Sequence, residues 1–246
     1  MALRAYFDES GTHSGGPDAS KAFVLCGYVA PESVWDDKGS NGLLARWDAV
    51  MHGKPFHATE MESNPQGPDI KVLLANVVNS SGVIGVRGGV SIPDFKRVLG
   101  PLIGKKKRRA DPYFFLFADV ILEAIMRSAM FLGENQDEPI GLVFSDHVRW
   151  SVEALQLYHR LRGDNDTPQE VRERMGVPAF ENINRFIPLQ AADHLAFESF
   201  HHMIDPVGTP RPAMNIFLNW PQNHGRFYRE HELLQYRELA QEKGIL

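Results

Sequence analysis

The feature that most constrains this chain is a regular alternation of short apolar runs with longer stretches of helical spacing. Runs typical of strands lie at residues 3–8, 22–30, 82–90 and 139–147, and the strongest helical pattern lies at 112–132. Strands that alternate with helices predict an α/β domain with a central sheet. In open α/β sheets, ligands bind beyond the carboxyl ends of the strands, so residues at those ends are the first candidates for function.

Acidic residues occupy such strand ends. The first strand ends in "YFDESG", with Asp8 followed by Glu9, and the run "LVFSD" ends in Asp146. Asp193 lies in the second turn of a later predicted helix, which opens with "PLQAAD". On a strand, the side chain of Glu9 points away from that of Asp8, so we expect Asp8 to be the ligand and Glu9 to lie behind it or in solvent.

Carboxylates brought together in this way repel one another. Two of them about 4 Å apart cost about 1 kcal/mol in water and about 4 kcal/mol at an effective dielectric constant near 20. Protonation, an arginine or a divalent cation can offset that repulsion. Oxygen ligands without a cysteine or histidine set suit Mg²⁺ or Mn²⁺, and such ions usually act on phosphate.

Composition and net charge limit the partners and the cellular compartment that we expect. The net charge of −5 and the pI near 6.1 give no global argument for nucleic acid or membrane. The run "KKKRR" at 105–109 is either a solvated loop or a local phosphate contact. Cys26 is the single cysteine, which excludes an intramolecular disulfide and suits a reducing cytoplasm. No apolar run approaches the roughly 20 residues that span a bilayer, so we expect a soluble, cytoplasmic protein.

Two patterns near the end of the chain predict further elements. We expect a strand at 182–187, followed by a helix with Pro188 in its first turn. On that helix His194, Glu198 and His201 recur at helical spacing. They could chelate a metal from one face, but a solvated polar stripe is the interpretation that we favour.

Four motifs occur in a fixed order: "YFDESG", "FHATE", "LVFSD" and "LQAAD". Together, over residues 3–203, they resemble the uncharacterised family known as domain of unknown function 3800 (DUF3800), which is similar to ribonuclease H-like proteins. The resemblance implies a mixed sheet of three antiparallel strands followed by parallel ones, flanked by helices. It places this domain at 1–205, with an inserted helical segment at about 31–80, and leaves 206–246 as an extension whose helix packs on the domain.

The resemblance also implies roles for particular acids. Ribonuclease H-like nucleases carry acids on the first strand, on a helix, on the fourth strand and on the last helix. Three of these places match the metal ligands expected here: Asp8, Asp146 and Asp193.

The sequence leaves open which residue supplies the remaining acid, the one on a helix. Order along the chain suggests Glu123 or Asp119, whereas "FHATE" offers Glu60. His57, in the same motif, is either a packed loop histidine or a general base beside the metal. His57 and Glu60 are therefore our candidates for proton transfer.

These inferences predict a metal-dependent phosphodiesterase or nuclease that hydrolyses nucleic acid with Mg²⁺ or Mn²⁺. One alternative is a non-catalytic module of the same fold that binds nucleic acid or a protein, with its acids paired to arginines such as Arg87, Arg149 or Arg185. Another is a metal hydrolase of small nucleotides or phosphate esters. The sequence does not distinguish DNA from RNA and leaves the oligomeric state open.

Overall fold

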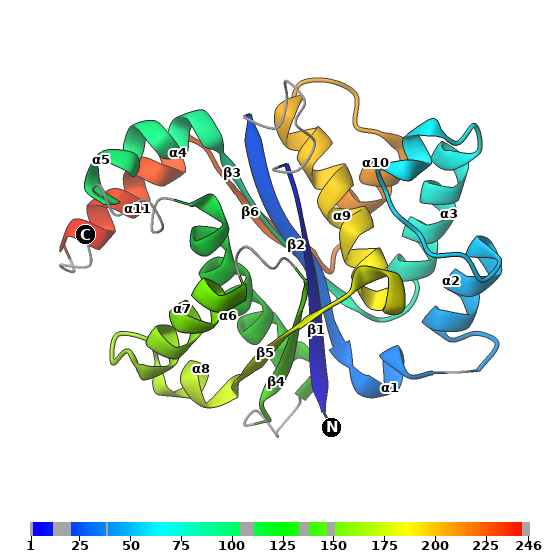
Figure 1. Cartoon of the computed structure of the whole chain (residues 1–246), viewed down its shortest axis with the longest axis horizontal. Coiled ribbons are helices and arrows are strands. Elements are labelled where there is room, and N and C mark those ends of the chain that lie inside the picture. Colours follow the sequence, from blue (N-terminus) through cyan, green and yellow to red (C-terminus); the bar gives the residue numbers. More distant parts are fainter. Residues whose placement is uncertain are drawn as a thin grey trace.

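The computed structural model describes residues 2–11, 21–37, 39–103, 111–132, 138–146 and 151–242. They contain one six-stranded sheet in the order β5-β4-β1-β2-β3-β6 (Figure 1). The strands are β1 (Leu3–Ser10), β2 (Ala22–Pro31), β3 (Ile84–Ser91), β4 (Ile140–Ser145), β5 (Met175–Glu181) and β6 (Asn223–Tyr228).

The sheet is mixed. β2 pairs antiparallel with β1 and β3, whereas β4 runs parallel to β1 and β5, and β6 runs parallel to β3. This confirms the predicted α/β class with a mixed sheet flanked by helices. Because β1 and β4 are parallel, their carboxyl ends lie at the same edge of the sheet, as the acid-ended strands require.

Helices cover both faces of the sheet (Figure 1). One face carries α4 (Ile92–Val98), α5 (Gly100–Ile103), α6 (Pro112–Leu132), α7 (Ser151–Gly163), α8 (Gln169–Arg174) and α11 (Glu230–Glu242). The other carries α1 (Glu32–Trp35), α2 (Leu43–Met51), α3 (Gly67–Asn79), α9 (Ile187–Ile204) and α10 (Pro212–Leu218), with the short turns η1 (Glu60–Ser63) and η2 (Ile183–Arg185).

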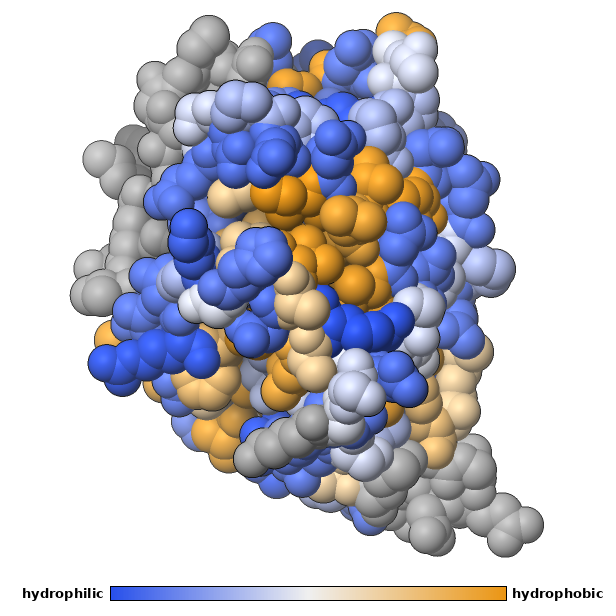
Figure 2. Space-filling view, turned by 90° about the vertical axis from the view of Figure 1, so that its right-hand side faces the viewer, coloured by the Kyte–Doolittle hydropathy of each residue, from blue (hydrophilic) through white to orange (hydrophobic). Residues whose placement is uncertain are grey.

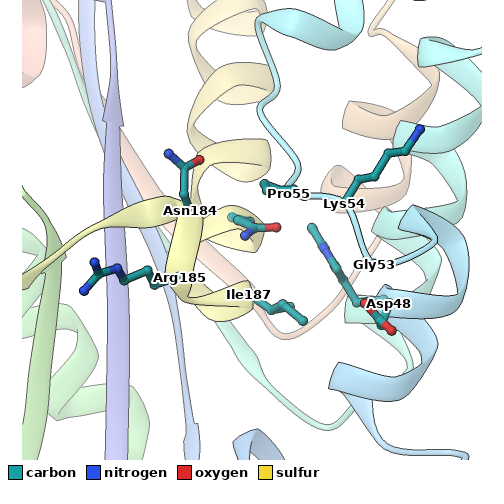
Figure 3. A pocket seen from close by; sticks show the side chains of 9 residues that line it. Asp48, Gly53, Lys54, Pro55, Asn184, Arg185 and Ile187 are labelled. Atoms are coloured by element: carbon teal, nitrogen blue, oxygen red, sulfur yellow. The ribbon is translucent and has the colours of Figure 1, made fainter.

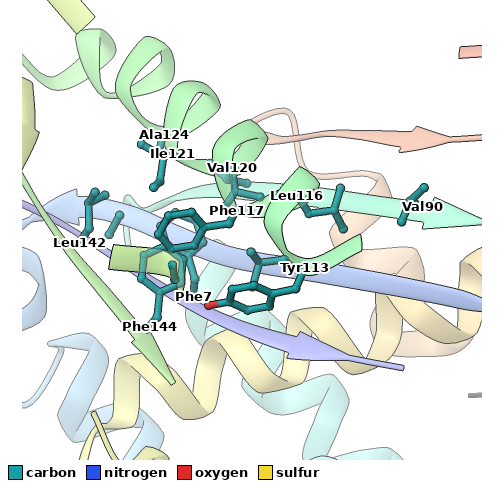
Figure 4. Packing of buried hydrophobic residues seen from close by; sticks show 14 of the residues in the cluster. Phe7, Val90, Tyr113, Leu116, Phe117, Val120, Ile121, Ala124, Leu142 and Phe144 are labelled. Carbon is teal, nitrogen blue, oxygen red and sulfur yellow. The ribbon is translucent and has the colours of Figure 1, made fainter. Parts of the chain in front are cut away.

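Helix α6 forms the core of the first face. Its first turn is fixed by Pro112 and by the Asp111 carboxylate, which accepts the Tyr113 N–H at 3.0 Å. Further along, the Phe117 ring lies 4.7 Å from that of Phe144 on β4 (Figure 4). Apolar side chains that alternate along β1 and β4, and that end in Phe7 and Phe144, thus meet the apolar side of α6, which is the burial that joins helix to sheet.

Helix α9 lies across β1 and β2 on the other face and is buried on nearly all sides. The prediction of a solvated polar stripe is therefore wrong for two of its three residues, because α3 and α10 cover them. His194 is fully buried between the rings of Phe56 and Phe217, and burial lowers its pKa to about 3, so it is neutral. Glu198 is 1% exposed and accepts a hydrogen bond from Arg211 at 3.1 Å.

The prediction of a strand at 182–187 is also wrong. β5 occupies 175–181, where it pairs with β4, and the chain then turns through η2. The cause is local: the Asn182 side chain accepts the Asn184 N–H at 2.9 Å, a capping bond that competes with extended pairing. Beyond residue 205 the chain adds β6 to the same sheet; the domain division there stays a prediction.

Figure 2 shows hydrophobic side chains gathered near the middle of the surface on the side of α2, α3 and α10. Exposed apolar residues of these helices include Leu73, at 53%, and Leu218, at 39%. None of the helices in the described ranges is both long and apolar enough to cross a membrane.

Candidate functional site

Asp8 and Asp193 form the centre of the candidate site. Asp8 is near the carboxyl end of β1 and Asp193 is in the second turn of α9, and they are 6% and 5% exposed. Burial and the negative charges of Glu9 and Asp193 raise the pKa of Asp8, so the two carboxylates are near enough to interact electrostatically. The structure therefore brings together the first and last acids predicted from the sequence.

Asp193 is held by the loop before η1. Its Oδ2 accepts the Ala58 N–H at 2.8 Å and lies 3.6 Å from Nδ1 of His57. Burial raises the pKa of Asp193 to about 6, although the Ala58 hydrogen bond and the charges of His57 and Lys71 oppose the rise. His57, predicted as a proton-transfer residue, thus stands beside one of the two central carboxylates.

Asp8 has a different set of neighbours. The Ser145 hydroxyl, at the end of β4, donates a hydrogen bond to its carboxylate. Burial, Glu9 and Asp193 nevertheless raise the pKa of Asp8 well above its ordinary value. Glu9 is itself 8% exposed, so of the two places expected for it, behind Asp8 or in solvent, the structure excludes solvent. Burial, and then the charges of Glu9 and Asp8, raise the pKa of Tyr113, which approaches from α6.

Asp146 is not level with Asp8 in the sheet. Phe7 is level with Phe144 in the pairing of β1 with β4, so Ser145, and not Asp146, is level with Asp8. Asp146 is exposed, and its N–H donates to the Glu181 carbonyl at 2.8 Å. It directly precedes residues 147–150, which lie outside the described ranges. Its role as a ligand stays a prediction.

None of the three helix candidates for the fourth acid lies with the pair. Glu60 is exposed at the start of η1. Glu123 forms an ion pair with Arg127, one turn along α6, at 2.7 Å. Asp119 accepts a hydrogen bond from Tyr228 of β6 at 2.7 Å. Both α6 acids serve the contact with β6, so the identity of a fourth ligand stays open.

The arginine pairing that the binding-module hypothesis requires is absent among the residues that the structure describes. The principal charges that act on Asp8 are those of Glu9 and Asp193, and those that act on Asp193 are those of His57, Lys71 and Glu9; no arginine is among them. Arg149, and the basic run 105–109, lie outside the described residues. Among the described residues, the principal positive charges therefore act on Asp193 and not on Asp8.

Lys71 is the neighbour that the sequence analysis missed. It lies on α3, is 1% exposed, forms an ion pair with Glu62 and lies 3.8 Å from Glu198. A signal for it existed, because Lys71 falls among the buried residues Gly67, Leu74, Ala75 and Val78 on the apolar face of the helix. A lysine on such a face is almost never buried without a partner.

A cavity of about 140 Å³ lies one turn from Asp193, between the loop after α2 and the start of α9 (Figure 3). Gln190 lines it and accepts the Phe56 N–H at 3.0 Å, which holds the loop bearing His57 against α9. Lys54 and Arg185 also line it, but Figure 3 shows their side chains pointing away from each other. The cavity therefore does not concentrate positive charge.

The chemistry of Asp8 and Asp193 fits a hard divalent cation. Their oxygens are the preferred ligand type, and burial, the main cause of their raised pKa values, disfavours the charged carboxylates that such an ion would stabilise. Within the described ranges, however, no group of three or more His, Cys, Asp or Glu side chains is placed to hold a metal. A complete ligand shell thus requires water, substrate or the residues after Asp146.

Comparison of the chain with models of protein families, with curated proteins and with solved structures finds no match.

Proposed function

We propose that this chain is a metal-dependent phosphodiesterase that cleaves nucleic acid, with Asp8 and Asp193 holding Mg²⁺ or Mn²⁺. The observation that carries the proposal is the burial of these two carboxylates side by side at the carboxyl end of β1, with no arginine among the described residues to neutralise them. A buried pair of like charges is costly, and structures usually retain such pairs at functional sites.

Two features support a ribonuclease H-like architecture. The antiparallel strands β1, β2 and β3 are followed along the chain by the parallel strands β4 and β5. The acids on the first strand and on the late helix α9 lie together, in the positions that the resemblance to DUF3800 implies.

Each residue has a task in this proposal. Asp8 and Asp193 would hold a divalent cation, which would neutralise their charges and supply Lewis-acid chemistry to a phosphodiester. Ser145 and the Ala58 N–H orient Asp8 and Asp193. His57 stands 3.6 Å from Asp193, where an imidazole can exchange a proton at neutral pH.

The test is cleavage of labelled single- and double-stranded DNA and RNA with Mg²⁺, Mn²⁺ or EDTA. Asp8→Asn and Asp193→Asn should each lower the rate by about 100-fold or more, since each removes a charge that binds the cation. The matched control is Asp166→Asn, the same chemical change at an exposed position in the turn after α7.

Cleavage by Asp8→Asn at the wild-type rate would overturn the proposal. Hydrolysis of a small phosphodiester without cleavage of any polymer would instead favour a hydrolase of small phosphate esters. The same preparations should be checked by circular dichroism, so that a loss of fold is not taken for a loss of chemistry.

A further inference from the structure

Arg87, in the middle of β3, is a partly buried cation without a counter-ion in the described part of the chain. Its Nε and Nη1 are shielded from solvent and have no hydrogen-bond partner there. The groups that favour its charged form are Cys26 and Tyr28, which are neutral at physiological pH, and burial lowers its pKa. A desolvated guanidinium with unused donors is unfavourable unless an acceptor reaches it.

A second unused donor lies on the same face of the sheet. Tyr28, on the neighbouring strand β2, is fully buried, and its hydroxyl has no partner among the described residues. Cys26 is paired directly with Arg87, and Tyr28 is two residues further along, so all three side chains project from one face. The charge of Arg87 acts on Tyr28, which places the two donors near each other.

Arg87 as a whole is partly exposed, although its Nε and Nη1 are shielded. The residue opposite it on β6 is the exposed Gly225, which places no side chain over it. The Phe227 ring lies 5.5 Å from the guanidinium, and the His202 ring lies 6.3 Å from Phe227. His202 also has a shielded Nδ1 without a partner in the described ranges. Aromatic and imidazole groups thus border the guanidinium without supplying a negative charge themselves; the carboxylate of Asp205 acts on His202.

We propose that Arg87 and Tyr28, bordered by His202, form a binding site for a phosphate group at the β6 edge of the sheet. The planar guanidinium donates two parallel hydrogen bonds to an oxyanion, and the Tyr28 hydroxyl donates to a third oxygen. The site is separate from the carboxylate pair: Cys26 lies between Asp8 and Arg87 across the sheet. It therefore stands whether or not the chain cleaves nucleic acid.

The test is thermal unfolding in EDTA with increasing inorganic phosphate or adenosine monophosphate, against sodium chloride at equal ionic strength. Both ligands carry a phosphate group. Tighter binding of inorganic phosphate would indicate a site for the free ion, whereas tighter binding of adenosine monophosphate would indicate a site for a nucleotide. Wild type should be stabilised in proportion to occupancy at concentrations up to about 10 mM. Arg87→Met should weaken binding about tenfold or more, and Tyr28→Phe should weaken it less.

Two controls separate this site from other causes. Arg229→Met removes an equal charge from an exposed position nearby, and Asp8→Asn changes the carboxylate site; neither should alter phosphate affinity. Without phosphate, Arg87→Met should melt no lower than wild type, because it removes an uncompensated charge.

Three results would overturn the proposal. The first is no phosphate-dependent shift in wild type with either ligand. The second is an equal loss of affinity in Arg229→Met and Arg87→Met, which would indicate non-specific attraction. The third is a lower melting temperature of phosphate-free Arg87→Met, which would assign the guanidinium a structural role.

Discussion

Asp193→Asn should stabilise the metal-free protein at neutral pH and flatten the dependence of its stability on pH. Burial raises the pKa of Asp193 from 3.8 to about 6. A carboxyl group whose pKa is raised by folding stabilises the folded state fully below its unfolded pKa, and this contribution is lost as the pH rises through the folded pKa. For Asp193 the loss falls between about pH 4 and about pH 7.

The size of the effect follows from the shift. A difference of about two pKa units corresponds to about 3 kcal/mol in the free energy of unfolding. Asparagine keeps an oxygen that can accept the Ala58 N–H, which Asp193 accepts at 2.8 Å, so the substitution removes charge with little change in shape. Wild type in EDTA should therefore lose about 3 kcal/mol more than Asp193→Asn over this range.

The assay is urea denaturation in EDTA at several pH values from about 4 to about 7, followed by tryptophan fluorescence. Asp166→Asn, at an exposed position, should follow wild type. Parallel pH profiles for wild type and Asp193→Asn would refute the reasoning, because they would show that the buried carboxyl group binds no extra proton in the folded state.

Two further substitutions test the surrounding framework. Lys71→Met should lower the free energy of unfolding by about 3 kcal/mol in urea titrations, because it leaves the buried Glu198 with one cation fewer; an unchanged midpoint would contradict this. Gly27→Ala would place a Cβ 1.9 Å from the Tyr6 carbonyl oxygen and should abolish the native circular dichroism spectrum, whereas Gly100→Ala meets nothing within 4 Å and should fold. If Gly27→Ala folds as well as Gly100→Ala, the packing argument is refuted.

The pair at the centre of the site was predicted from local patterns together with the resemblance to DUF3800. An apolar run that ends in Asp8 and a helix whose second turn carries Asp193 are visible in the sequence, but their spacing alone does not show that they meet. His57 was singled out through a motif of the same resemblance. These predictions depended on which elements meet and did not depend on exact register.

Register and tertiary competition explain what the sequence left open. A one-residue offset between β1 and β4 places Ser145 level with Asp8, and sequence alone does not fix the offset of two parallel strands, so the role of Asp146 as a ligand stays a prediction. Glu123 looked available on an apolar helix, but Arg127, one turn along, neutralises it. The strand β6 follows a proline-rich connection and is partly exposed, so it lacks the apolar signal of an inner strand.

The most direct test of the metal-binding claim is a calorimetric titration of Mn²⁺ into wild type and Asp8→Asn near pH 6, in two buffers of different ionisation enthalpy. Because burial raises the pKa of both Asp8 and Asp193, Mn²⁺ binding to wild type should release protons, and Asp8→Asn should not bind. No binding by wild type at millimolar Mn²⁺, or equal binding by Asp8→Asn, would contradict a cation site at these carboxylates.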